Sequence, residues 1–356
     1  MKKIKLGKKL TKKQKIIFGV IGAIAVIGIA LGVVFLTKDR PEEKVDNKTE
    51  ETKKTETSVK KLQIVDENSN SRPYAVMINN INVARPLQSG LQDAYLMYEM
   101  IVEGGITRYL ALFMDANTER IGSVRSARHY YLDYALENDA IYVHHGQSPE
   151  AASDFSKLNI DRIVVDNSKT GWRDKSLKVS SEHRLFTSIE KLKNGTGKLR
   201  TTRNKDLLLN YSIDEIDMAS LPGATPASNI AIKYSNYITT SYTYDATNKY
   251  YLRSVNGVAH TDYVTKNQYH FKNIITYQVR NFTLNDGENK GRQELENVGS
   301  GTGYFISGGY SVPIKWSKSS RSSQTVYTLE NGEELKVNDG NTFIQIQPSG
   351  QTLSIS

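Results

Sequence analysis

The chain has 356 residues, no cysteine and a formal net charge of +9. A chain of this length can bury a sizeable core and is long enough for two domains. The lack of cysteine excludes disulfides, thiolate metal sites, thiol nucleophiles and a lipid attached through a lipobox cysteine.

The positive charge lies near the amino terminus. Residues 1–61 hold 16 of the 47 basic residues and seven of the 38 acidic ones, so the remaining 295 residues carry 31 of each. That larger part is formally neutral and lacks the basic surplus typical of nucleic-acid-binding domains. We therefore expect no nucleic-acid partner for it.

Residues 16–36 form an uncharged apolar stretch of 21 residues. At about 1.5 Å per residue, a helix of this length crosses a hydrocarbon core about 30 Å thick. Every lysine in residues 1–36 precedes the stretch, so the positive-inside rule places a basic tail, residues 1–15, in the cytoplasm. The alternative is a cleaved signal peptide, but the sequence VVFLTKDR offers no small-residue cleavage site. The prediction is a single-pass anchor in the cell membrane with the folded domains extracellular.

Residues 37–61 mix both charges and contain no aromatic residue. Such a segment cannot bury enough apolar surface to fold, because its side chains are almost all solvated. We expect a disordered charged linker between the membrane and the folded domains.

Residues 62–221 alternate short apolar strands with helical patterns, which predicts an α/β layered domain with a mixed sheet. Strands are expected at 74–78, 107–115, 140–145 and 161–166, and helices at 126–138, 148–158 and 182–193. Residues 91–103 fit either a helix or a strand. In both cases a spacing of four puts Glu99 and Glu103 on one face.

Three arginines, Arg120, Arg125 and Arg128, lie with no acidic residue between them near the start of the predicted helix 126–138, which Ser126 could cap. Unpaired amides at a helix start, together with guanidinium groups, favour a phosphate or a carboxylate. The alternative is a structural network in which these arginines pair with nearby carboxylates. The two interpretations do not exclude each other.

The histidines are weaker candidates. His144 and His145 are neighbours on a predicted strand and should point to opposite faces, which makes them poor joint metal ligands. One of them could act as an acid or base while the other packs. His183 is expected at the start of the helix 182–193. No spacing typical of a catalytic metal occurs, so we expect neither a metal nor a cofactor.

Residues 222–356 follow a Pro- and Gly-rich boundary and consist of short strands with turn signals. The pair Asn331–Gly332 predicts a hairpin between residues 326–329 and 334–337, and residues 342–347 alternate as a further strand. We expect a smaller, antiparallel β-rich domain and an overall α+β class.

Several motifs are shared with one known family: Arg72-Pro73, Ala84-Arg85-Pro86, Tyr98-Glu99, the run Glu103 to Arg108, Gly122 to Arg128, His144 to Ala151, Asn338-Asp339-Gly340 and Ile344 to Pro348. Together they resemble the YerB-like lipoproteins, bacterial surface proteins that contain a domain of unknown function. The resemblance implies an amino-terminal α/β part and a smaller carboxy-terminal domain, and it implies no reaction. The chain departs from the family in lacking a lipobox cysteine and in having Glu182-His183-Arg184 where Pro-His-Asn is expected.

The leading hypothesis is a membrane-anchored cell-envelope protein that binds an anionic cell-wall polymer or lipid-linked precursor. The candidate ligands of that anion are Arg108, Arg120, Ser123, Arg125, Ser126, Arg128, His145 and His183. The alternative is a hydrolase or transferase acting on a glycan or phosphodiester, with Glu99, Glu103 and His144 as catalytic candidates.

Overall fold

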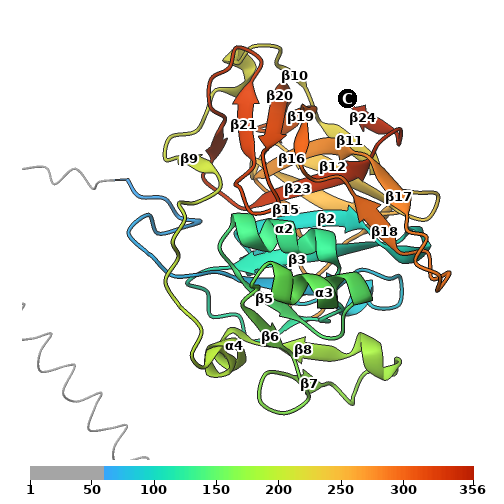
Figure 1. The fold of residues 1–356 in the computed structure, drawn as a ribbon. Helices are drawn as coiled ribbons and strands as arrows, with labels where there is room; N and C mark the ends of the chain where they lie inside the picture. The colour runs from blue at the N-terminus through green and yellow to red at the C-terminus, as the bar shows by residue number, and fades with distance from the viewer. Residues whose placement is uncertain (1–59) are drawn as a thin grey trace, which may run out of the picture. The chain divides into compact units, whose positions relative to one another are not determined.

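A long mixed sheet runs through residues 60–356, the part of the chain that the computed structural model describes (Figure 1). Its eleven strands follow the order β10-β20-β19-β16-β23-β2-β3-β1-β5-β6, with β21 beside β20. Their bounds are β1 Tyr74–Asn79, β2 Leu96–Ile101, β3 Thr107–Phe113, β5 Ile141–His144, β6 Arg162–Val164, β10 Thr225–Pro226, β16 Asn273–Val279, β19 Gly299–Ser307, β20 Tyr310–Lys318, β21 Val326–Leu329 and β23 Thr342–Pro348. The four strands predicted in the first half are confirmed, and the ambiguous segment 91–103 contains strand β2.

Strand β23 enters this sheet from the far end of the chain. It lies between β2 and β16 and runs parallel to both, with Tyr98 opposite Ile344 and Ile275 opposite the same residue. All seven of its residues are buried, including Gln345 and Gln347. The expectation of an antiparallel β-rich domain in residues 222–356 is therefore wrong at β23, because a strand covered on both faces can lie between parallel neighbours.

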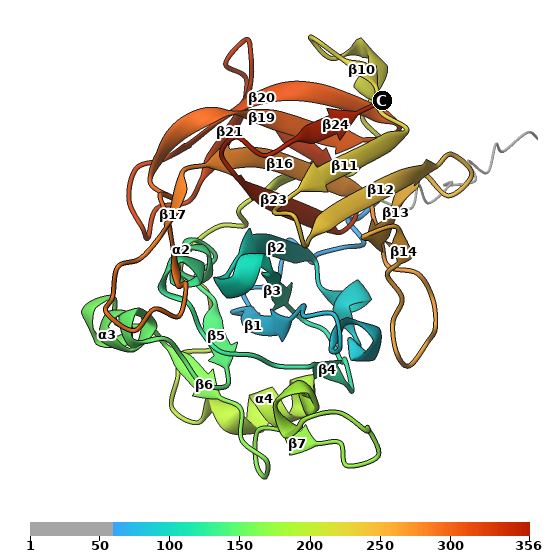
Figure 2. The ribbon, with the colours of Figure 1, turned by 90° about the vertical axis from the view of Figure 1, so that its right-hand side faces the viewer.

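A six-stranded sheet covers one face of the long sheet, and helices α2 and α3 lie on the opposite side (Figure 2). The strands of the six-stranded sheet are β11 Asn229–Lys233, β12 Thr239–Asp245, β13 Tyr250–Val255, β14 Val258–Ala259, β15 His270–Phe271 and β24 Leu353–Ile355. Arg253 of β13 lies 5.0 Å from the ring of Tyr109 and 5.1 Å from that of Phe343. On the other face, the Tyr131 hydroxyl of α2 donates to the carbonyls of Met100 and Arg108. The described part is thus mostly sheet, with few helices, in a two-part layout.

The helices are α2 His129–Glu137, α3 Pro149–Lys157 and α4 Ile189–Thr196. Ser148 and Ser188 cap α3 and α4, as their side chains accept hydrogen bonds from the amides of Ala151 and Lys191. Helix α2 begins after Arg128 and has no side-chain cap, so the predicted Ser126 cap is wrong. The predicted helix 182–193 is also wrong in its first half, where a 3₁₀ turn and a strand precede α4.

The remaining strands form three small sheets. β4 Ile121–Gly122 pairs with β8 Leu185–Thr187, which pairs with β7 Trp172–Arg173; β9 Asn210–Ser212 pairs with β22 Lys336–Asn338, and β17 Asn281–Thr283 with β18 Gln293–Leu295. The turn predicted at Asn331–Gly332 is present, since the Gly332 amide donates to the Leu329 carbonyl. The predicted hairpin is confirmed next to the turn, where Thr328 and Glu334 form an antiparallel bridge and the Leu335 amide donates to the Tyr327 carbonyl. Farther along the chain, β22 pairs with β9.

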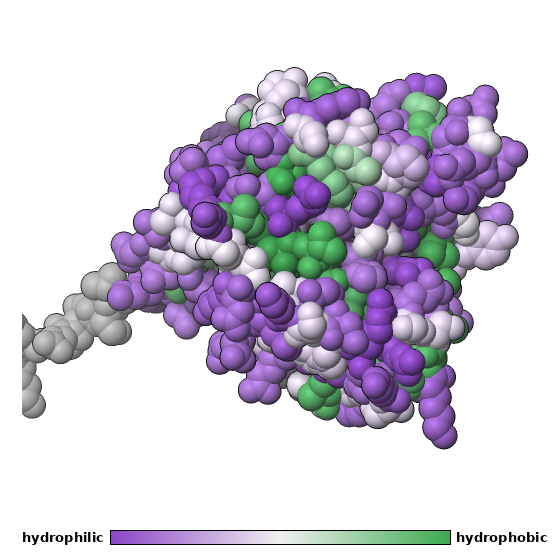
Figure 3. All heavy atoms as spheres, turned by 60° about the horizontal axis from the view of Figure 1, so that its bottom comes forward, coloured by the Kyte–Doolittle hydropathy of each residue, from purple (hydrophilic) through white to green (hydrophobic). Residues whose placement is uncertain are grey.

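Residues 60–356 group as one unit by their contacts. The predicted tail and anchor, and all of the predicted linker except Lys60 and Lys61, lie outside the described residues. The predicted boundary near residue 221 stays a prediction. Of the helices between residues 60 and 356, none is long and apolar enough to cross a membrane. The face seen in Figure 3 is mainly hydrophilic, with apolar residues gathered in a central area bordered by polar ones.

Candidate functional site

The carboxyl ends of the parallel strands β1, β5 and β6 meet at one edge of the long sheet. Ligands of α/β sheets bind at such edges, because loops rather than strands continue from them. The segment 123–128 is fixed across this edge. The Arg125 amide donates to the Met77 carbonyl at 2.9 Å, and the His145 amide donates to the Arg125 carbonyl at 3.1 Å.

Arg125 projects from this segment toward the 3₁₀ turn at residues 181–183. Its Nη2 lies 3.1 Å from Oε2 of Glu182, whose other oxygen is 3.4 Å from Nε2 of His183. Nδ1 of His183 lies 3.1 Å from the side-chain amide nitrogen of Asn79, at the end of β1. Burial lowers the pKa of His183, and the nearby Arg125 charge acts in the same direction.

His145 and Arg173 complete the group. Nδ1 of His145 is 2.7 Å from the Val165 carbonyl, and Nε2 is 3.0 Å from Nη2 of Arg173. Arg173 also donates to the carbonyl of Ser181 and has no carboxylate partner within the described part of the chain. We call Arg125, His145, Arg173, Glu182 and His183 the strand-edge cluster.

The strand-edge cluster has a surplus of positive charge. Two guanidinium groups face one carboxylate, that of Glu182, whose side chain is 55% exposed. Because Arg173 donates to Nε2 of His145, that nitrogen carries no proton in this arrangement and the ring is neutral. The arrangement can accept an anion at a sheet edge open to solvent.

A second group lies at the start of α2. Nε and Nη2 of Arg128 both donate to the carboxylate of Glu103, and Nη2 of Arg108 is 3.9 Å from the same carboxylate. Burial raises the pKa of Glu103, but the hydrogen bonds and charge of Arg128 bring it below its usual value. Burial, with the charge of Arg128, lowers the pKa of Arg108 to about 10. The guanidinium of Arg128 is therefore already occupied.

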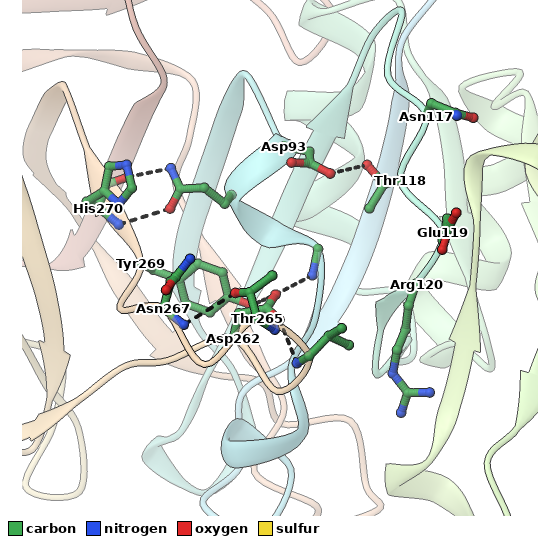
Figure 4. Close-up of a pocket in the computed structure, with 13 residues that line it drawn as sticks. Asp93, Asn117, Thr118, Glu119, Arg120, Asp262, Thr265, Asn267, Tyr269 and His270 are labelled. Carbon is green, nitrogen blue, oxygen red and sulfur yellow. Dashed lines mark hydrogen bonds between the residues drawn. The ribbon is translucent and has the colours of Figure 1, made fainter. Parts of the chain in front are cut away.

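Arg120 does not join the other arginines. Its Nη1 is 2.9 Å from Asp174, and its guanidinium lies 3.6 Å from the centre of the Phe186 ring. It lines a separate cavity of about 450 Å³, together with Asp93, Thr118 and Asp262 (Figure 4). The expected convergence of three arginines is wrong for Arg120, because the extended strand β4 separates it from Arg125.

Glu99 and Glu103 do not share a face, contrary to prediction. Glu99 is fully buried and faces the six-stranded sheet, with Nη2 of Arg253 at 2.8 Å and the Thr107 hydroxyl at 2.7 Å. Glu103 lies beyond the end of β2 at Ile101, where the alternation of a strand no longer holds, and it points toward α2. Glu99 is out of reach of any solvent-borne substrate.

His144 and His145 do point to different surroundings, as expected for neighbours on a strand. His144 is buried, with Nδ1 2.8 Å from the Gly146 carbonyl and its ring 5.0 Å from that of Phe155. Burial lowers its pKa to about 4, so the ring is neutral at neutral pH. The side chain of Ser123 is buried as well. The backbone carbonyl of Ser126 accepts a hydrogen bond from Nη1 of Arg108.

Sequence reasoning missed Arg173, Glu182 and Asn79 as parts of this site. Arg173 sits on a two-residue strand, too short for any periodic pattern, and reaches His145 from 28 positions away. Asn79 carried a usable signal, because a polar residue that ends a buried strand marks a sheet edge. Among the residues that the structure describes, no group of three or more metal-ligating side chains is found.

Fold and site together define a sheet-rich protein with a cationic sheet edge. Residues 61–212 match the N-terminal domain, and residues 230–344 the C-terminal domain, of a family described as "Protein of unknown function (DUF3048)". The protein named "Putative lipoprotein YerB" from Bacillus subtilis (strain 168) is 29% identical over 293 residues, covering 80% of this chain and 84% of its own. The crystal structure of YerB from Bacillus subtilis matches with a TM-score of 0.68 at 28% identity, covering 80% of this chain and 94% of its own. The chain belongs to this YerB-like family.

Proposed function

We propose that this protein is a membrane-anchored, extracytoplasmic component of the cell envelope, and that its strand-edge cluster binds an anionic group of a wall polymer or lipid-linked precursor. The observation that carries the proposal is that the Arg173 guanidinium contacts His145 and the Ser181 carbonyl but no carboxylate within residues 60–356. A single exposed carboxylate, that of Glu182, therefore balances the two guanidinium groups of Arg125 and Arg173. A phosphate or carboxylate would supply the missing negative charge.

The ion pair between Arg125 and Glu182 leaves room for such a ligand. Both side chains are partly exposed, 23% for Arg125 and 55% for Glu182. Exposed pairs of this kind contribute only about 0–1 kcal/mol, because water screens them and the side chains lose entropy. A polyanion can therefore displace Glu182 at small cost and bridge Arg125 and Arg173.

The proposed location rests on two observations. The uncharged stretch 16–36 is long enough to span a bilayer, with the lysines of the first 15 residues on one side of it. The relative from Bacillus subtilis is named a lipoprotein, which indicates anchorage at a membrane for that protein. An uncleaved helix in this chain would replace the lipid, for which no cysteine is present.

The alternative of a hydrolase or transferase has less support, because its carboxylates are engaged. Glu99 is enclosed with Arg253, and Glu103 is held by Arg128. A general acid or base must reach its substrate within hydrogen-bond distance, which buried Glu99 cannot do. Binding without turnover is the function that the geometry favours.

Retention on cell-wall material tests the proposal. Full-length protein in detergent is mixed with purified peptidoglycan that does or does not carry teichoic acid, and with lipid-linked precursor in micelles. We expect retention on at least one of them to fall at least tenfold in the double variant Arg125→Ala, Arg173→Ala. The matched control Arg280→Ala removes an exposed, paired arginine elsewhere and should bind as the unaltered protein does. Equal retention by the double variant would refute the proposal, and released product would favour the enzyme.

A further inference from the structure

A small pocket lies between the segment that follows β1 and the strands β13 and β14. Its volume is about 210 Å³, and its lining includes Arg85 and Thr261 as well as the apolar Pro86, Val255 and Val258. None of the residues that line it is acidic. It shares no residue with the strand-edge cluster, so what it binds is independent of the function proposed above.

Arg85 is the cation of this pocket. Its Nε donates to the side-chain oxygen of Asn80 at 2.9 Å, and its Nη2 donates to the Asn80 carbonyl at 3.0 Å. Its third nitrogen, Nη1, has no hydrogen-bond partner, and no carboxylate pairs with Arg85, anywhere in residues 60–356. The guanidinium is thus fixed in direction and keeps a donor free.

Asn80, which holds Arg85, belongs to a buried hydrogen-bond network that begins at Glu99. Asn80 donates to the Thr107 hydroxyl at 2.7 Å, and this hydroxyl donates to Glu99 at 2.7 Å. Such a chain of buried hydrogen bonds holds its members in one geometry. Arg85 is therefore oriented before any ligand arrives.

A second branch of the same network fixes the opposite wall. Arg253 lies between Glu99 and His260, with Nη1 2.6 Å from Nδ1 of the histidine, and Nε2 of His260 faces the side-chain oxygen of Gln88. Since Arg253 donates to Nδ1, the ring is neutral, and burial together with the charge of Arg253 lowers its pKa. The motif residues Arg85, Glu99 and Thr107 thus belong to one hydrogen-bond network, which reaches the pocket at Arg85 and His260. The strand-edge cluster uses none of them.

We propose that this pocket binds the carboxylate of a small organic acid, either free or at the end of a peptide, with Arg85 as its ion-pair partner. A guanidinium matches the planar carboxylate, and the absence of acids in the lining leaves its charge available. Pro86, Val255 and Val258 would cover a short apolar group next to the carboxylate. Pockets for drug-sized ligands begin at about 300 Å³, so the group must be smaller than these.

Calorimetric titration of the full-length protein in detergent tests this site. The probes are N-acetylvaline, a decapeptide that ends in valine, and the amide of each, which lacks the carboxylate. We expect saturable binding of at least one acid and at least tenfold weaker binding of its amide. Binding of both acids would include peptide ends among the ligands, whereas binding of N-acetylvaline alone would restrict them to small acids.

Two variants tie the binding to the pocket. Arg85→Gln should weaken binding of the acid at least tenfold, and Arg280→Gln, at an exposed arginine outside both sites, should leave that binding unchanged. Because Arg85→Gln can also disturb Asn80, a second pair of variants changes the charge at Val258, whose side chain is 69% exposed. Val258→Glu should weaken the acid, and Val258→Lys should not. Absence of saturable binding, or equal binding of acid and amide, would overturn the proposal.

Discussion

Glu99 connects the two sheets through its ion pair with Arg253, in which both side chains are completely buried. Removing one partner leaves the other charge in the core without compensation. We predict that Glu99→Gln lowers the free energy of unfolding by about 3–5 kcal/mol. Urea unfolding followed by circular dichroism measures the change.

The exposed pair of Arg280 and Glu296 provides the matched comparison, with side chains 68% and 47% exposed. Glu296→Gln should cost less than about 1 kcal/mol, because water already screens that pair. Similar costs at Glu99 and Glu296 would show that the buried network contributes no more than a surface contact.

His144 makes stability depend on pH. Its pKa is about 4 in the folded protein, because burial disfavours the charged ring, and about 6.5 in the unfolded chain. The unfolded state therefore binds more protons between these values, and stability falls as the pH falls through this window. We predict that His144 accounts for a loss of about 3 kcal/mol between pH 7 and pH 4, at about 1.4 kcal/mol per unit.

The measurement is urea unfolding at pH 7 and at pH 4.5 for the unaltered protein and for His144→Gln. The variant should lose less stability on acidification than the unaltered protein. A parallel loss in both would mean that other groups carry the pH dependence.

At the scale of elements, β23 is the strand on which both halves of the long sheet depend. Ile344 is fully buried and pairs with residues of β2 and of β16. We predict that Ile344→Ala lowers the free energy of unfolding by about 2–5 kcal/mol, as expected for a core side chain that leaves a cavity. Thermal unfolding by calorimetry measures this, and Val326→Ala, at a position 51% exposed, is the control.

The sequence predicts those elements whose signals are local. The apolar run of β1 is sufficient to predict a strand, and the Ser148-Pro149 pair is sufficient to predict the start of helix α3. Both elements are confirmed. The partners of β23 could not be predicted from the sequence. Gln345 and Gln347 alternate with apolar residues, a pattern typical of an antiparallel strand with one exposed face, but both side chains are buried. Likewise, nothing near Glu99 indicates that its partner lies 154 residues away.

At the scale of the whole molecule, the position of β23 predicts that residues 60–356 unfold as one unit. The two tryptophans report on different parts, because Trp172 lies in the small sheet of β7 and Trp316 in β20. We expect Trp172→Phe and Trp316→Phe, each with one tryptophan left, to show coincident fluorescence and circular dichroism transitions in urea. A separate, earlier transition at one tryptophan would show two independent domains.

The strand-edge cluster has a proposed place for an anion, which the Glu182 carboxylate partly fills from within the chain. Titration of the full-length protein in detergent with purified polyglycerol phosphate, for Glu182→Gln and Arg173→Gln side by side, tests it most directly. Glu182→Gln removes the internal competitor and should tighten binding about threefold to tenfold, whereas Arg173→Gln should weaken it by at least as much. Affinities that stay the same in both variants, or that change in the same direction, would show that the strand-edge cluster is not the anion site.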